Sequence, residues 1–158
     1  MRRILLGLLS IFISTAALAD DKDKLLGTWK LVAFVLEDAE TKEKKALFGE
    51  HPMGYFTFLP NGRTTVILTA EGRSMPRNDA ERAAAFQSMT AYSGQYRLEG
   101  NKLVVDVDVA WNAAWVGTSQ TRTIKLDRDK LDIISATQPN PNFGGRMMTG
   151  LLGWERVK

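Results

Sequence analysis

The sequence predicts an all-β protein, an antiparallel β-barrel of about eight strands with one short helix. Short segments of alternating apolar and polar residues recur after residue 20, with turn-forming residues between them and no low-complexity linker. The chain contains no cysteine, so a packed core must stabilise it without disulfides. About eight strands is the number at which a barrel closes around its own side chains or one small ligand.

The first 19 residues are predicted to form a signal peptide that precedes this fold. Arg2 and Arg3 make a basic start, residues 4–18 are almost continuously apolar, and Ala17-Leu18-Ala19 has the small-x-small form of a cleavage site. The alternative is a membrane anchor, but the apolar run is shorter than the roughly 20 residues that a spanning helix needs. We therefore expect residues 20–158 to form one barrel domain, periplasmic or secreted, with no stable membrane anchor.

Charge and composition argue against several classes of function. Removing the signal peptide also removes two arginines, which leaves 21 − 2 = 19 basic residues against 18 acidic ones. A charge near +1 gives no electrostatic reason to expect nucleic-acid binding. His51 is the single histidine, and no nucleophile–histidine set or zinc site can be assembled around it. We predict no catalytic residue, no metal and no cofactor.

Eight segments have the length and alternation of strands. The first places Trp29, Leu31, Ala33 and Val35 on one side, and Asn61-Gly62 joins the second and third as a tight hairpin. The segments are 25–37, 54–59, 63–70, 92–98, 102–111, 120–127, 130–136 and 151–157.

One helix is expected between the third and fourth segments. Asn78 can cap it, Glu81 stands at the capping-box position, and Ala83, Phe86 and Met89 recur at helical spacing. A helix with one apolar stripe is best used against a sheet. We expect it to cover the barrel as a lid or to pack against its side.

The first and last segments are expected to pair, because this pairing removes the open edges of the sheet. Trp29 lies in the first segment, and Trp154 and Arg156 lie in the last. We assign these three residues to closure of the barrel.

Five blocks of the sequence, spread over residues 25–157, resemble the lipocalin-like domain family of small bacterial and fungal proteins. They are LLGTWKLVAF, GEHPMGYFTFLPNGR, YSGQYRL, WVGTSQTRTIKL and GWERV. The resemblance implies a β-barrel with a small-molecule cavity, in a family whose function is mostly unassigned. The Gly27-x-Trp29 start is also similar to that of true lipocalins, in which an arginine from late in the chain covers a tryptophan at the barrel base.

Arg122 is the most unusual residue of the predicted interior. Gln120, Arg122, Ile124 and Leu126 share one face of their strand, and burying an unpaired guanidinium costs several kcal/mol. Two explanations stay open. Arg122 is a structural lock, stacked over Trp29 or paired with an internal acid, or it contacts a ligand.

Asp106 and Asp108 are expected to be solvated, because they lie opposite Val105, Val107 and Val109 on their strand. In the reverse orientation they would become partners for an internal arginine. The apolar alternation favours the first arrangement.

The predicted ligand site combines polar groups with aromatic surface. Such mixtures are typical of small-molecule pockets, although tyrosines inside a barrel also serve as core. Trp111 and Trp115 lie in a loop, where they would form the cavity rim or seal the helix against the sheet. The residues expected to contact the ligand are Arg122, Gln120, Tyr96, Tyr92, Trp115 and Tyr55.

We therefore predict that the protein binds a small hydrophobic or amphipathic molecule inside the barrel. An isomerase or cyclase that works in the same cavity is one alternative, and it requires a perturbed acid inside. An envelope protein-interaction or inhibitor module is the other, and it requires a filled barrel with a rigid protruding loop. The state of the barrel interior distinguishes the three functions: an empty interior indicates binding, a polar one catalysis, and a packed one protein interaction.

Overall fold

A computed structural model of the protein describes residues 22–140 and 143–158. The predicted signal peptide, its cleavage site and the first two residues after that site lie outside the described residues.

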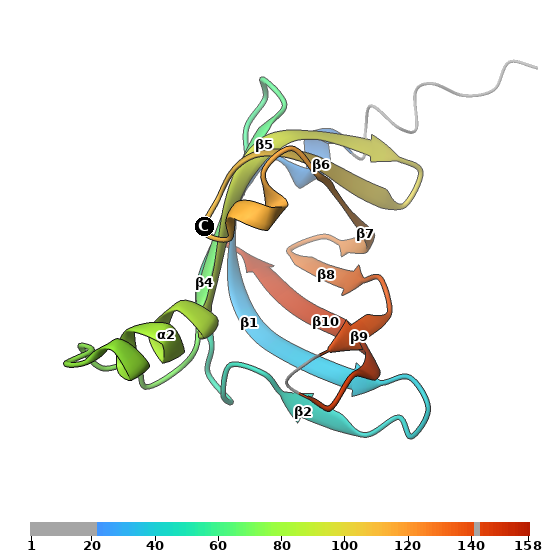
Figure 1. The fold of residues 1–158 in the computed structure, drawn as a ribbon. Helices are drawn as coiled ribbons and strands as arrows, with labels where there is room; N and C mark the ends of the chain where they lie inside the picture. The colour runs from blue at the N-terminus through green and yellow to red at the C-terminus, as the bar shows by residue number, and fades with distance from the viewer. Residues whose placement is uncertain (1–21, 141–142) are drawn as a thin grey trace, which may run out of the picture.

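Eight strands close into an antiparallel barrel (Figure 1). Each strand pairs with the next along the chain, and the last pairs with the first. The predicted fold class is confirmed, including closure by the first and last strands. The strands are β1 (Gly27–Asp38), β3 (Met53–Phe58), β4 (Arg63–Thr69), β5 (Met89–Glu99), β6 (Lys102–Ala110), β7 (Ser119–Asp127), β8 (Lys130–Ser135) and β10 (Arg146–Arg156).

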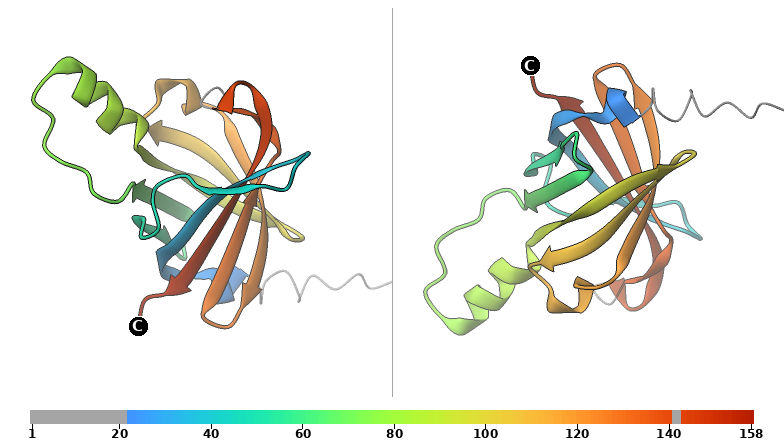
Figure 2. Two further views of the ribbon diagram at one scale, coloured as in Figure 1. Left: turned by 90° about the horizontal axis from the view of Figure 1, so that it is seen from below. Right: turned by 90° about the horizontal axis from the view of Figure 1, so that it is seen from above.

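Two short strands that we did not predict extend the barrel at one end. β2 (Lys44–Ala46) pairs with the second half of β1, and β9 (Gln138–Asn140) pairs with the first half of β10. The 3-10 helix η1 (Ala113–Trp115) lies at the same end (Figure 2). We call this end the mouth. The opposite end, where the helical turn at residues 22–25 meets the end of β10, is the base.

A β-bulge in β1 overturns one prediction about the interior. We expected Ala33 and Val35 to share the inner face with Leu31. The register against β10 shifts between Leu31 and Ala33, and an extra residue in one strand reverses the alternation beyond it. Phe34 and Leu36 therefore line the interior, and Ala33 and Val35 lie on the outer face.

A second irregularity reverses the alternation of inward and outward side chains at the end of β6. The register between β5 and β6 shifts near Ser93 and Gly94. Val105 and Val107 are buried as expected, but Val109 is 61 % exposed. The prediction that all three valines face inward was therefore wrong for the last one.

Asp106 and Asp108 lie on the solvent side of β6, as expected. Asp106 forms an ion pair with Arg97, and Asp108 pairs with Arg63 through two hydrogen bonds. Neither acid is a partner for an arginine inside the barrel.

Helix α2 (Asp79–Gln87) forms where the sequence predicts it, but it does not cover the barrel. Asn78 caps it by accepting a hydrogen bond from the backbone N–H of Glu81 at 2.9 Å. No residue of α2 is buried, and Figures 1 and 2 show the helix projecting away from the strands. The expected lid or side-packed helix is therefore corrected to an arm outside the barrel.

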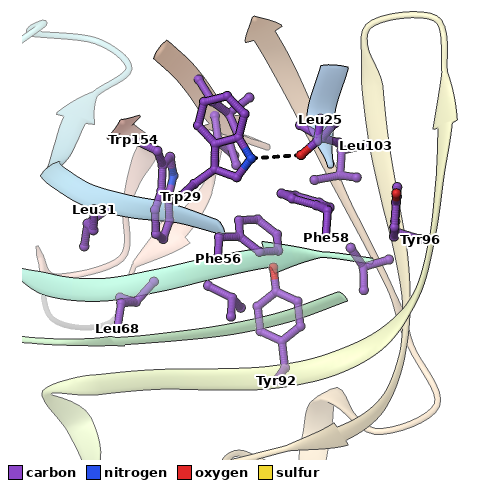
Figure 3. Packing of buried hydrophobic residues seen from close by; sticks show 14 of the residues in the cluster. Leu25, Trp29, Leu31, Phe56, Phe58, Leu68, Tyr92, Tyr96, Leu103 and Trp154 are labelled. Atoms are coloured by element: carbon purple, nitrogen blue, oxygen red, sulfur yellow. Dashed lines mark hydrogen bonds between the residues drawn. The ribbon is translucent and has the colours of Figure 1, made fainter. Parts of the chain in front are cut away.

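The base is packed solid around Trp29 (Figure 3). The indole N–H of Trp29 donates to the carbonyl of Leu25 at 2.9 Å, and both residues are fully buried. The guanidinium carbon of Arg156 lies 4.2 Å from the centre of a Trp29 ring, close enough for a cation–π contact. Arg156, rather than Arg122, is the arginine that covers this tryptophan.

Candidate functional site

A cavity of about 240 Å³ occupies the mouth half of the barrel. This volume is a little below the range of roughly 300–1,000 Å³ typical of small-molecule pockets, so it suits a compact ligand. Aliphatic and phenyl side chains from strands on all sides form most of its wall. The main ones are Phe34, Phe56, Val66, Leu68, Ile133 and Leu152.

Trp154 forms the deep end of the cavity. β10 runs from the mouth to the base, and its inward side chains follow in the order Leu152, Trp154 and Arg156. The Trp154 side chain is 2 % exposed, and its ring centre lies 5.5 Å from that of Phe56 (Figure 3). Its buried indole N–H has no hydrogen-bond partner among the described residues, a state that costs about 1–3 kcal/mol when nothing satisfies the donor.

Two further tryptophans form the rim. Trp111 and Trp115 meet edge to face, with ring centres 4.9 Å apart, and both line the cavity. Trp115 packs on Tyr92 at 5.4 Å, and Phe86 from the last turn of α2 lies 6.2 Å from Trp111. The N–H of Trp111 is also buried and unpartnered within the described residues. Two of the residues that line the cavity thus have a buried N–H group without an acceptor among the described residues.

Arg122 lines the cavity near its mouth. It pairs across the sheet with Ser135, the last residue of β8, and its guanidinium carbon lies 6.0 Å from the centre of a Trp115 ring. One terminal nitrogen donates to the carbonyl of Thr121 at 2.8 Å, and the other donates to the side-chain oxygen of Gln120 at 3.0 Å. A guanidinium has five N–H donors, and no carboxylate within the described residues pairs with this one.

The positive charge of Arg122 acts on Tyr92, a buried residue of the cavity wall. Burial raises the pKa of Tyr92, and the positive charge of Arg122 opposes that rise. The hydroxyl of Tyr92 extends from β5 into the barrel toward Phe56 (Figure 3). Arg122 is the one charged side chain in the described lining, so the one charge in the described cavity wall is positive.

The structure brings together only part of the predicted site. Arg122, Tyr92 and Trp115 line the cavity, and Gln120 holds the guanidinium from outside the lining.

Tyr96 and Tyr55 need correction as residues of this cavity. Tyr96 lies in the base, packed against Phe58 at 5.1 Å, with its hydroxyl donating to the carbonyl of Leu59. Tyr55 lies on the outer face of β3 and is 50 % exposed.

Two lining residues escaped the sequence reasoning. Trp154 was assigned to barrel closure only, although its strand position just above Arg156 places it in the cavity. Phe34 was placed on the outer face, because nothing in the sequence marks the bulge before it. Its inward direction became visible only from the register of β1 against β10.

Other kinds of site find little support within the described ranges. No group of three or more histidine, cysteine, aspartate or glutamate side chains there could hold a metal ion. His51 is exposed, in a loop. None of the helices described is long and apolar enough to cross a membrane.

A closed antiparallel barrel of eight strands with a cavity at one end is the architecture of lipocalin-like proteins. Residues 26–157 match the family model for the lipocalin-like domain, and the chain belongs to this family.

Two solved structures are similar to the chain. A lipocalin-like protein from Bacteroides uniformis shares 13% sequence identity, with 85% of this chain and 99% of that one covered and a TM-score of 0.48. An uncharacterized protein from Bacteroides eggerthii shares 12%, with 83% and 98% covered and a TM-score of 0.41. Among curated proteins, none matches the chain significantly.

Proposed function

We propose that the protein binds a small hydrophobic or amphipathic molecule inside the barrel. The observation that carries this proposal is the cavity with an aromatic and aliphatic wall and one charged side chain, Arg122. The apolar wall offers area for an apolar body, and the guanidinium offers hydrogen bonds for polar atoms. Family membership agrees with small-ligand binding in general.

The proposal is tested by filling the cavity. Val66 is 2 % exposed on the inner face of β4, paired with Phe56, so Val66→Phe places a larger ring in the cavity. Ile67, the next residue, is 47 % exposed on the outer face, and Ile67→Phe is the matched control. We expect organic extraction and mass spectrometry to find a co-purifying compound in the wild type and in Ile67→Phe, but not in Val66→Phe.

Overpacking costs about 1–3 kcal/mol, so circular dichroism must first show that Val66→Phe is folded. Equal ligand content in folded Val66→Phe and in Ile67→Phe would contradict binding in this cavity. If the natural compound is lost on purification, titration of Val66→Phe and Ile67→Phe with a hydrophobic fluorescent probe measures the same difference in binding.

Catalysis in the cavity has weaker support. An isomerase or cyclase needs an acid or base inside the barrel whose pKa lies near neutrality. The described lining holds no aspartate, glutamate or histidine, and burial moves the pKa of Tyr92 further above neutrality. A protein-interaction module would have a filled barrel, whereas the mouth half here is hollow. The geometry therefore favours binding.

We also propose export to the periplasm or to the medium, on the basis of the basic start, apolar run and small-x-small site at residues 1–19. Amino-terminal sequencing of the protein from an envelope or medium fraction is expected to begin at Asp20. An intact amino terminus in the membrane fraction would instead support an anchor.

A further inference from the structure

We propose that the molecule in the cavity is an anionic amphipath, with a carboxylate-type head at Arg122 and a compact apolar body directed toward Trp154. This inference rests on the proposed function and specifies its ligand class. It follows from the charge, the hydrogen-bonding groups and the polarity gradient of the cavity.

The charge of the cavity lining favours an anion. Arg122 is the one charged side chain in the described lining, and its two hydrogen bonds go to neutral oxygens of Thr121 and Gln120. The acids of neighbouring β6 are turned away, each paired with an arginine on the solvent side. A guanidinium that retains unused N–H groups beside an apolar wall binds a planar oxyanion through paired hydrogen bonds better than it binds a neutral oxygen.

The hydrogen-bonding groups at the mouth favour a ligand with acceptors. A guanidinium has five N–H donors and no acceptor, and Arg122 uses one terminal nitrogen on Thr121 and the other on Gln120. Carboxylate and carbonyl oxygens can accept from the remaining N–H groups, whereas an ammonium group has only donors.

The position of Arg122 in the cavity determines the orientation of the ligand. Arg122 lies opposite Ser135 near the mouth, while Phe56, Val66 and Trp154 form the deep wall. A charged head is less costly to desolvate near the opening than at the closed end. The head therefore lies at the mouth and the apolar body fills the depth.

The test compares three probes of equal length and different head groups: octanoate, octanol and octylammonium. Tryptophan fluorescence and calorimetric titration follow their binding to the purified protein. We expect octanoate to bind at least about ten-fold more tightly than octanol, because a hydrogen bond to a charged group contributes more than one to a neutral group. Octylammonium should bind most weakly.

The arginine is tested by Arg122→Gln, which should remove the preference for octanoate while octanol binds as before. Lys125 lies on the same strand with its side chain exposed on the opposite face, and Lys125→Gln removes the same charge there. This control should retain the preference. If Arg122→Gln fails to fold, the selectivity of the wild type and its loss at high salt still test the inference.

Two results would overturn the anionic ligand and leave the binding function intact. One is equal affinity of the wild type for octanoate and octanol, or tighter binding of octylammonium. The other is an undiminished preference for octanoate in folded Arg122→Gln. Failure of every probe, together with no co-purifying compound, would overturn the proposed function itself.

Discussion

The two ends of the barrel use the same pair of residues, a tryptophan and an arginine, in different states. At the base, Arg156 lies 4.2 Å from a Trp29 ring centre and donates to the carbonyls of Leu26 and Lys24. The indole of Trp29 donates to Leu25. The polar groups of this pair are satisfied by the backbone of residues 24–26 and by the carboxylate of Asp129, which lies 3.3 Å from Nε of Arg156.

At the mouth, Arg122 lies 6.0 Å from a Trp115 ring centre and donates only to neighbours on its own strand, Thr121 and Gln120. The adjacent Trp111 has a buried N–H with no partner in the described chain. The comparison teaches that residue type does not decide the role of a tryptophan–arginine pair. A pair whose hydrogen-bond donors all have partners in the protein has a structural role. A pair beside a cavity whose arginine keeps unused donors can bind a ligand.

The largest expected difference between the two ends is in the tryptophans. Trp29→Ala should lower the free energy of unfolding by about 3–5 kcal/mol, because it empties a fully buried site. Trp115→Ala should lower it by about 1 kcal/mol or less, since this side chain is only partly buried. Urea denaturation measures both, and similar losses would show that the rim is as structural as the base.

We expect Arg156 to contribute to stability and Arg122 to contribute to ligand binding. Arg156→Met should lower the free energy of unfolding by about 1.5–3 kcal/mol, because it removes charge-assisted hydrogen bonds to two carbonyls and the ion pair with Asp129. Arg122→Met should change it by no more than about 0.5 kcal/mol while abolishing the preference for octanoate. Unfolding of Arg122→Met would instead assign both arginines to structure.

Acid should weaken the contribution of Asp38, in the turn after β1, to the stability of the fold. The backbone N–H groups of Thr41 and Glu40 lower the pKa of Asp38 below its ordinary value of 3.8, with help from Arg146 at 3.1 Å. A carboxyl whose pKa is lowered by folding stabilises the fold above its unfolded pKa, and this contribution is lost as pH falls through the folded value.

Urea midpoints measured from about pH 5 to about pH 2 should therefore fall below pH 3.8 more steeply in the wild type than in Asp38→Asn. Asp132→Asn, an exposed substitution on β8, is the matched control and should follow the wild type. Parallel curves for all three proteins would show that the turn after β1 does not contribute.

The smallest expected effect concerns α2, the arm beside the mouth. Asn78→Ala removes the cap and should destabilise the helix locally by about 0.5–2 kcal/mol, leaving the urea midpoint of the barrel unchanged. Hydrogen exchange should show faster exchange in 79–87 only. A lower midpoint would mean that the arm stabilises the barrel.

The sequence was sufficient where strands are regular. β7 has no bulge in its pairing with β6 or β8, so the period of two correctly placed Arg122 with Ile124 on the inner side. The same reasoning failed in β1, because Ala33 and Val35 are as apolar as Phe34 and Leu36, and alternation cannot reveal which pair follows a bulge.

The sequence also could not predict which elements distant in the chain pack against one another. Asn78 and Glu81 predicted the start of α2, but capping signals describe the helix ends and not the surface against which a helix packs. From the sequence we likewise considered Arg122 for the Trp29 site and assigned Arg156 only to closure of the barrel. Only the pairing of β10 with β1 decides that Arg156 occupies it.

The pairing of β1 with β10 has a consequence for the rate at which this protein folds. It joins segments such as Leu26 and Arg156, which are 130 residues apart in sequence. Barrels dominated by such distant contacts fold slowly, on the scale of milliseconds to seconds, because loop closure opposes each contact until the final strand docks. Until β10 docks, β1 and β8 expose unpaired edges that other chains can bind. The docking of β10, which brings Arg156 onto Trp29, therefore ends the interval in which aggregation competes with folding.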